Sequence, residues 1–477
     1  MMIKKIFLLF VIFGGVVMLN AEEKYFPVEE LVPGSWFVNS IQKTRADREK
    51  FYLEKVAKIV PDEVQRAARA EAFHRMLEIN SFSSNRAEDE AIERALGWKK
   101  GDFTWHNNTF YTKTGCTSWI ITPDISATGA CMVQKNRDYK GQNLLSARLY
   151  RAEPGKYKVI TVNDLWSSGA GAVMNEKGLM IVQNDGSSVL KQELPNRSIT
   201  VGCIFMLRHI AEHCANLDEA VAMLKKFYRT GLGRSSSIYL LADLDSGAII
   251  ETTGKHLAYA EVNFSYEVRA NNYLLPGMRS TVNKTRDAFL NGANRRYAAS
   301  EFLRKVVADK GKIAPFDLMR LARFRQPGIE KTYKYRSVCV NASLASTMFV
   351  PDRQFPEYLS VAFVALGPQR HTVFLPIPMG LSAMPESLIN GDWGSKALAL
   401  SNVLPLDHQY IPEFETVETR FIDEFFAARE QARKLLVSGK RPEAVKLLDK
   451  VFRKQYGEAK QILADFTKKV TSTKEKK

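Results

Sequence analysis

A candidate nucleophile lies in the run Thr114-Gly115-Cys116-Thr117-Ser118, directly before the apolar residues Trp119-Ile120-Ile121. A glycine at position 115 lets the Cys116 thiol approach the Gly115 carbonyl without a Cβ in the way, and it permits a strained or positive-φ backbone. Attack there would give a thioester by an N-to-S acyl shift, and water would then release Cys116 with a free α-amino group. The run therefore predicts self-cleavage of the Gly115–Cys116 bond.

An N-terminal cysteine can supply both groups that amide cleavage needs. An α-amino group ordinarily titrates at about 7.7 to 8.0 and a cysteine thiol at about 8.5, so one residue would hold both base and nucleophile. No catalytic histidine is then required. The tripeptide alone is a weak signal, and a buried structural cysteine at the start of a strand is the alternative interpretation.

A second polar run, Lys135-Asn136-Arg137-Asp138, ends the next predicted strand. A hairpin would return this run beside Cys116. Asp138 would then hold the α-ammonium group or orient the amine, and Lys135 would favour the thiolate form of Cys116. By itself, the run is also an ordinary charged turn.

Three motifs of the chain resemble those of the cysteine N-terminal nucleophile (Ntn) hydrolases. That group includes isopenicillin N acyltransferase, choloylglycine hydrolases, penicillin V acylases, acid ceramidase and the Cys-Thr dipeptidases. The resemblance covers residues from about 115 to 375, and the order and spacing of the motifs make it fairly specific. The motifs are Cys116-Thr117-Ser118-Trp119-Ile120, Gln134-Lys135-Asn136-Arg137-Asp138-Tyr139, and Met174-Asn175-Glu176-Lys177-Gly178-Leu179 leading to Asn184.

The resemblance implies a role for each matching residue. Cys116 would be the nucleophile and Asp138 the partner of its amine. Asn184 and Asn271 would stabilise the oxyanion, and donors of this kind are each worth about 3 kcal/mol. Arg336 would be a cation that positions the substrate or the nucleophile.

Two branches of the group contribute to the resemblance. Residues 336–350 and the run His371-Thr372-Val373-Phe374 look most like the dipeptidase branch, whereas the long segment before Cys116 looks like the acyltransferase branch, which is cut at an internal Gly-Cys bond. Lys135 stands where many relatives have arginine, and Arg137 stands where several branches have a hydrophobic residue. These departures leave the substrate class open.

The hydrophobic periodicity predicts helices before Cys116 and two blocks of strands after it. Expected helices are 45–59, 61–79, 200–216, 217–228, 284–308, 314–324, 421–436 and 442–466, with Pro61 at a first turn. Expected strands are 119–122, 130–134, 158–162, 178–183, 238–242, 248–252, 256–262, 266–273, 338–341, 343–350, 358–365 and 372–375. The segment Trp166-Ser167-Ser168-Gly169-Ala170-Gly171 is expected to be either a flexible rim over the substrate or a plain connecting loop.

Two strand blocks with partner helices indicate an α+β fold. The resemblance implies a four-layer αββα Ntn-hydrolase sandwich, with an N-terminal helical segment and a C-terminal helical hairpin. The expected organisation is a signal peptide over 1–21, a helical segment (propeptide or small chain) over 22–115, the αββα domain over 116–405, the hairpin over 406–470 and a basic tail over 471–477.

The first 21 residues have the layout of a secretory signal, with Lys4 and Lys5 before an apolar run and Asn20-Ala21 before the charged mature start. The apolar run is too short for a confident membrane span, although an uncleaved N-terminal anchor is the alternative. We expect export to the periplasm or the extracellular space, with no integral span in the mature chain.

Five cysteines in an exported chain raise the question of disulfides. Cys203 and Cys214 are expected on one helix, where eleven residues rise about 16 Å and prevent pairing. Cys131 and Cys339 lie in strand-like runs and either pair or are buried free thiols. No metal-ligand spacing and no phosphate-binding loop occurs, so we expect neither metal nor cofactor.

The chain carries a formal net charge of +16, spread along its length and concentrated again in the last helices. No aromatic and basic nucleic-acid motif accompanies this charge, so nucleic acid is not an expected partner. We expect a small-molecule or peptide amide as substrate and leave a homo-oligomer open. The predicted function is an exported, self-processed amidohydrolase or acyltransferase, with a dipeptidase for envelope peptides and a non-catalytic envelope-binding protein as alternatives.

Overall fold

The computed structural model describes residues 23–31, 36–42, 46–109, 115–139, 144–186, 189–194, 199–233, 236–283, 285–326 and 337–475. The predicted signal peptide and Arg336 lie outside the described residues. No helix within the described part of the chain is both long enough and apolar enough to span a bilayer.

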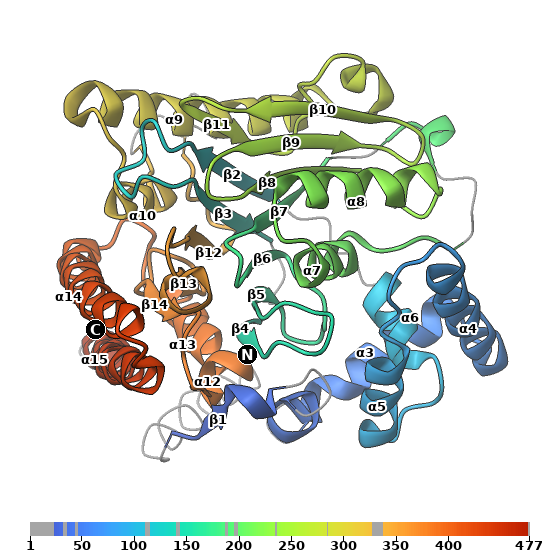
Figure 1. Cartoon of the computed structure of the whole chain (residues 1–477), viewed down its shortest axis with the longest axis horizontal. Coiled ribbons are helices and arrows are strands. Elements are labelled where there is room, and N and C mark those ends of the chain that lie inside the picture. Colours follow the sequence, from blue (N-terminus) through green and yellow to red (C-terminus); the bar gives the residue numbers. More distant parts are fainter. Residues whose placement is uncertain are drawn as a thin grey trace.

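Two antiparallel sheets form the centre of the fold (Figure 1). The seven-stranded sheet has the order β10-β9-β8-β7-β6-β5-β4, and the six-stranded sheet has the order β11-β2-β3-β12-β13-β14. The first comprises β4 (Leu145–Tyr150), β5 (Val159–Asp164), β6 (Ala172–Asn175), β7 (Met180–Asp185), β8 (Ser237–Ala242), β9 (Gly247–Thr252) and β10 (Leu257–Val262). The second comprises β2 (Gly115–Ile121), β3 (Met132–Asp138), β11 (Tyr266–Arg269), β12 (Ser343–Val350), β13 (Val361–Leu366) and β14 (Leu375–Pro378).

The sheets face each other and helices cover both outer faces. Strands β2 and β3 contact β7 and β8 across the interface. Helices α7 (Cys203–His213) and α8 (Leu217–Arg229) cover the seven-stranded sheet. Helices α9 (Arg286–Lys310), α10 (Pro315–Arg323), α14 (Ile411–Val437) and α15 (Arg441–Glu475) cover the six-stranded sheet. This arrangement confirms the predicted four-layer αββα sandwich.

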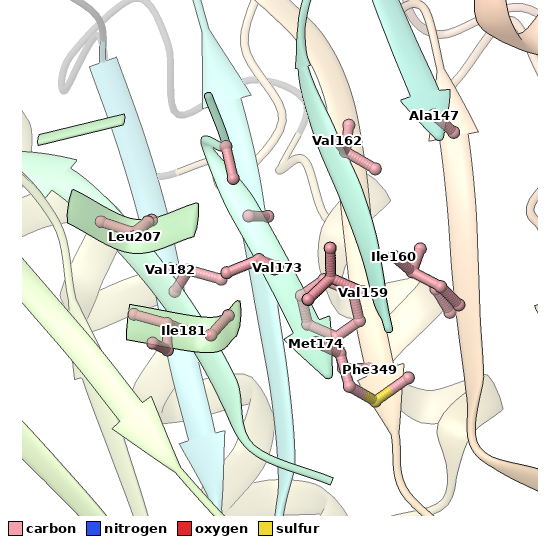
Figure 2. Packing of buried hydrophobic residues seen from close by; sticks show 14 of the residues in the cluster. Ala147, Val159, Ile160, Val162, Val173, Met174, Ile181, Val182, Leu207 and Phe349 are labelled. Carbon is pink, nitrogen blue, oxygen red and sulfur yellow. The ribbon is translucent and has the colours of Figure 1, made fainter. Parts of the chain in front are cut away.

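Strand alternation divides the apolar residues between two cores. In β2, Trp119 and Ile121 pack toward the helices on the outer face, whereas Ile120 belongs to the cluster between the sheets. Figure 2 shows part of that cluster, with Ile160 of one sheet, Phe349 of the other and Leu207 of α7. Because residues two apart share a face, Cys116 and Ser118 lie on the same face as Ile120. The nucleophile therefore faces the space between the sheets.

The residues before the nucleophile are helical, as predicted. They form a short π-helix (Phe37–Gln42) and helices α3 (Ala46–Ile59), α4 (Glu63–Ile79), α5 (Arg86–Leu96) and α6 (Asp102–Thr109). Asp62 caps α4 by accepting from the backbone N–H groups of Val64 and Gln65, so the helix begins just after the predicted Pro61 start. These helices lie beside α7, at the end of the molecule away from the α14–α15 hairpin (Figure 1).

The predicted C-terminal hairpin is present, and its second helix continues to Glu475, into the segment predicted as a basic tail. A fully buried ion pair attaches the hairpin to the sandwich: both Nη atoms of Arg323 on α10 contact the carboxylate of Glu418 on α14. Arg323 also donates to the carbonyls of Gln369 and Thr372, and Glu418 accepts from the Phe374 N–H. The residues around 369–374 thus serve to join the hairpin to the sandwich.

Some elements differ from the predictions. Residues 338–341 form no strand, and the last predicted strand lies instead at Leu375–Pro378. Strands β4 and β6 were missed, since β4 carries the polar residues Ser146 and Arg148 within a buried strand. Cys131 and Cys339 are buried and form no disulfide, and neither do Cys203 and Cys214.

His371 gives the fold a pH-dependent contribution. Its ring is buried, its Nε2 lies 3.1 Å from the Leu404 carbonyl, and its pKa falls from 6.5 to about 4, first because of burial and then because of His408. The unfolded chain therefore binds a proton that the folded chain excludes, so this stability is present above pH 6.5 and is lost as the pH falls toward 4. We expect about 2 kcal/mol of this contribution to be lost at pH 5.

Urea unfolding at pH 7 and pH 5 measures this contribution. His371→Gln should lose about 2 kcal/mol less between the two pH values than the wild type loses. Equal pH dependence in the wild type and in His371→Gln would rule the contribution out.

Candidate active site

Cys116 is the second residue of β2, a strand between β11 and β3. In the β2–β3 register Cys116 pairs with Arg137 and Gly115 pairs with Asp138. This confirms the predicted hairpin that returns the polar run beside the nucleophile. Cys116 is completely buried.

On the outer face of the sheet, Asp138 lies against Gly115. A Cβ added to Gly115 would stand 3.2 Å from Asp138 Cβ and 3.4 Å from Asp138 Oδ2. Gly115 is an ordinary strand residue without the positive φ that the sequence suggested. The space that glycine leaves is therefore occupied by the Asp138 side chain, and the positive φ that a glycine would permit is not used.

The Asp138 carboxyl group is buried among polar partners. It accepts a hydrogen bond from Ser343 Oγ (2.6 Å), and its Oδ2 lies 3.8 Å from Arg295 Nη1. Burial raises the pKa of Asp138, and the charge of Arg295 opposes this rise. A carboxyl group with a raised pKa beside the scissile bond can accept or return a proton during cleavage.

Asn271 contacts the nucleophile directly. Its Oδ1 accepts from the backbone N–H of Cys116 at 3.0 Å, and its Nδ2 donates to the Asp185 carbonyl at 2.8 Å. In this uncut chain the carbonyl end of Asn271 therefore holds the atom that would become the α-amine. Its predicted role as an oxyanion donor requires Nδ2 at the reacting carbonyl and stays a prediction.

Arg295 on α9 is the site residue that the sequence reasoning missed. Its Nη1 contacts the Cys116 carbonyl and donates to Thr117 Oγ1 (2.6 Å), and its Nη2 donates to Asn271 Oδ1 (2.6 Å). The side chain is 5% exposed. The sequence places this arginine in the run Asn294-Arg295-Arg296-Tyr297 of a predicted helix. Arg295 lies at helical spacing from the small residues Gly292, Ala298 and Ala299, which are buried in the same helix. This spacing is the signal that could have placed Arg295 on the face packed against the sheet.

Lys135 and Arg137 share the inner face of the sheet with Cys116. Lys135 Nζ donates to the Gly171 carbonyl (3.2 Å) and to the Gln183 carbonyl. Burial lowers the pKa of Lys135, and its interaction with Cys116 opposes this decrease. Arg137 pairs with Asp164 at 2.7 Å. The side of the sheet on which the thiol lies is thus lined by two cations.

Asn184 reaches the site through Ser118. Its Oδ1 accepts from Ser118 Oγ (2.7 Å), while its Nδ2 donates to the carbonyls of Arg269 (3.1 Å) and Ala270 (3.3 Å). It therefore fixes β2 against β7 and supports the turn that carries Asn271. Its predicted oxyanion role is untested by these contacts.

The third predicted motif, Met174–Leu179, stabilises a turn. In the Met174–Leu179 motif, Asn175 closes the β6–β7 turn by accepting from the N–H groups of Lys177 and Leu179 and donates to two carbonyls of the α7 end. A groove of about 690 Å³ lies elsewhere, between α8 and the β9–β10 hairpin. Its lining residues do not include Cys116 or any of the partners described above.

Within the described residues, no cluster of three or more His, Cys, Asp or Glu side chains could hold a metal ion.

The family comparison matches this region. Residues 126–319 match the model of the acyl-coenzyme A:6-aminopenicillanic acid acyl-transferase family. This range contains Asp138, Asn184, Asn271 and Arg295, and it begins ten residues after Cys116. A search of curated proteins by sequence gave no match.

Three solved structures illustrate the structural likeness. A mutant of conjugated bile acid hydrolase from Clostridium perfringens is 12% identical over 56% of this chain and 92% of its own, with a TM-score of 0.38. A Caenorhabditis elegans N-acylethanolamine-hydrolyzing acid amidase ortholog is 14% identical over 50% and 95%, with a TM-score of 0.33. Penicillin V acylase from Agrobacterium tumefaciens is 16% identical over 55% and 86%, with a TM-score of 0.34.

The candidate site and the family match lie in the same part of the chain. A cysteine directly after a glycine starts a central strand of an αββα sandwich, and buried carboxyl, amide and guanidinium groups surround its backbone. The matched residues include strands of both sheets and the helices α7, α8 and α9. Over residues 126–319 the chain is similar to the acyl-coenzyme A:6-aminopenicillanic acid acyl-transferase family.

Proposed function

We propose that the chain is an exported precursor that cuts its own Gly115–Cys116 bond and then cleaves linear carboxamides through a thioester on Cys116. The observation that supports this most is the contact of Asn271 Oδ1 with the Cys116 backbone nitrogen, beside Asp138 and Gly115. A structural cysteine would need no polar partner at its backbone nitrogen beyond the strand ladder. Here the nitrogen donates to a side-chain acceptor, Asn271 Oδ1.

This geometry supports the proposed self-cleavage. The Cys116 thiol gives its proton to solvent water, and its sulfur attacks the Gly115 carbonyl carbon. The Gly115–Cys116 C–N bond breaks as the nitrogen takes a proton from a protonated carboxyl group, which solvent then reprotonates. Asp138, whose pKa is raised by burial, is the nearest carboxyl group to Gly115 and supplies this proton. Water then hydrolyses the thioester, which leaves a carboxylate on Gly115 and a free thiol and amine on Cys116.

Turnover uses the same groups on an external amide. The α-amine accepts the thiol proton and passes it to the leaving nitrogen as the thioester forms. Asn271 Oδ1 and Asp138 hold the amine, while Lys135 and Arg137 provide positive charge on the side of the thiol. Water or an amine then accepts the acyl group, which gives hydrolysis or acyl transfer.

Intact mass and N-terminal sequencing of the purified protein test the proposal. The wild type should yield a chain that begins at Cys116, and Cys116→Ala should remain joined across that bond. Sequencing of the upstream chain should also find a start after Ala21 if export removes the signal. A wild type that stays uncut, with Cys116 unreactive to iodoacetamide, would contradict the proposed mechanism.

A substrate panel separates the enzyme classes. Dipeptides, N-acyl amino acids, penicillin V and bile-salt amides distinguish a dipeptidase from an acylase. A binding role would instead give salt-sensitive attachment to anionic envelope polymers that persists unchanged in Cys116→Ala. Hydrolysis of one panel member by the wild type and its absence in Cys116→Ala is the expected result.

A further inference from the structure

The loop Trp166–Gly171 is held by the helical segment that self-cleavage would detach. His106 and Asn107, near the end of α6, carry these contacts. His106 Nε2 lies 2.7 Å from the Trp166 carbonyl oxygen. Asn107 accepts from Ser167 Oγ (2.9 Å) and the Ser168 N–H (3.3 Å) and donates to Ser168 Oγ (2.7 Å). All of these residues are buried, so the loop is anchored and is no flexible rim.

The indole of Trp166 is enclosed by rings of the same segment. Tyr52 stacks on it at a centroid distance of 5.1 Å and Trp98 at 6.1 Å, with interplanar angles of 25° and 9°. Phe37 meets its edge at 5.3 Å. Aromatic pairs of this kind add about 0.5 to 1.5 kcal/mol each to the area they bury. The loop is thus docked into the helical segment by apolar as well as polar contacts.

The other end of the loop supports the nucleophile. The Gly171 carbonyl accepts from Lys135 Nζ at 3.2 Å, and Lys135 shares the inner face of the sheet with Cys116. The residues between the two ends are held by backbone hydrogen bonds and a close approach. Ala170 donates to the Ile204 carbonyl (2.9 Å), Gly171 donates to the Val162 carbonyl (3.1 Å), and a Cβ on Gly169 would stand 2.8 Å from Ile204 O.

We propose that His106 and Asn107 are positioning residues that hold Lys135 beside Cys116 through the Trp166–Gly171 loop. The inference rests on the proposed function, since it gives the detached segment a part in the finished site. Helix α6 ends at Thr109, seven residues before Cys116. Cleavage removes the covalent link between them, and the contacts at the loop remain as the link between the segment and the nucleophile.

The test first uses Cys116→Ala, in which no cut occurs, so that the result does not depend on self-cleavage. Adding His106→Ala or Asn107→Ala should speed hydrogen exchange of the Ala170 and Gly171 amides at least about 10-fold. Neither amide contacts His106 or Asn107, so a merely local role would leave both unchanged. Phe82→Leu is the control: its ring stacks on Phe227 of α8 at 3.9 Å, away from the loop, and should leave both amides protected.

The second arm uses the cleaved protein. The iodoacetamide reaction of Cys116 at pH 7 should slow at least about 3-fold in His106→Ala, and its pH profile should move to higher pH, because Lys135 is less well placed. His106→Gln keeps an N–H donor for the Trp166 carbonyl and should recover most of the rate. Unchanged exchange at Ala170 and Gly171 would overturn the proposal and leave the proposed function standing. An uncut wild type would overturn the proposed function and leave the exchange result intact.

Discussion

Arg295→Met should slow the appearance of the chain that begins at Cys116 by about 100-fold or more. The guanidinium donates to Thr117 Oγ1 and Asn271 Oδ1 and contacts the Cys116 carbonyl. Hydrogen bonds to a charged group contribute about 1.5 to 3 kcal/mol each, and the loss of two of them exceeds the roughly 2.7 kcal/mol that a 100-fold rate change represents. Asn271 would also lose the cation that fixes the direction of its amide.

Pulse-labelled expression followed by intact-mass analysis gives the cleavage rate. Arg295→Lys keeps one charge but cannot reach three acceptors in a fixed plane, so it should fall between Arg295→Met and the wild type. Arg304→Met removes an arginine from the same helix whose side chain is 61% exposed, and it should cleave at the wild-type rate. Wild-type cleavage by Arg295→Met would show that the arginine takes no part in arranging the site.

Glu418→Gln should lower the free energy of unfolding by about 3 to 5 kcal/mol, since it leaves the Arg323 charge buried without its partner. The side chains of both residues are at most 2% exposed. Urea unfolding at pH 7, followed by far-UV circular dichroism, measures the loss. Glu415→Gln, one turn earlier and partly exposed, is the matched control and should change stability by less than about 0.5 kcal/mol.

A double variant separates a buried charge from a simple packing defect. Arg323→Met with Glu418→Leu removes both charges and fills the space with apolar atoms, so it should be more stable than Glu418→Gln alone. A double variant as unstable as the sum of its parts would mean that the pair acts through packing and not through charge. That result would contradict the electrostatic account of the hairpin attachment.

The sequence predicted the parts of the site that follow from strand pairing along a short stretch of chain. The hairpin between β2 and β3 placed Asp138 beside Gly115 because the two strands are consecutive and their register follows from the alternation of apolar residues. The four layers were implied by the resemblance, and the strands and helices that build them followed largely from periodicity. Most of the predicted strands and helices therefore lie within a few residues of their predicted positions.

Other parts depend on contacts that periodicity does not encode. Arg295 reaches Cys116 from a helix 179 residues further along the chain, and one arginine on a helix looks like its neighbours until the packed face is known. Strand β4 was missed because Arg148 is polar, although in the fold its charge is satisfied by the carbonyls of Leu165 and Ser167. The contact of Gly115 with Asp138 was not predicted, because the sequence does not show which side chain fills the space beside a glycine.

The enclosed indole of Trp166 has a consequence for the order of events during biosynthesis. Rings from residues 37, 52 and 98 surround a side chain that belongs to the later part of the chain. Such a cage forms only while both parts fold together, so the proposed scission of the chain would follow folding. Two separately made pieces would each expose these apolar rings to water, and under the proposed function the uncut precursor would be the form in which the two parts assemble.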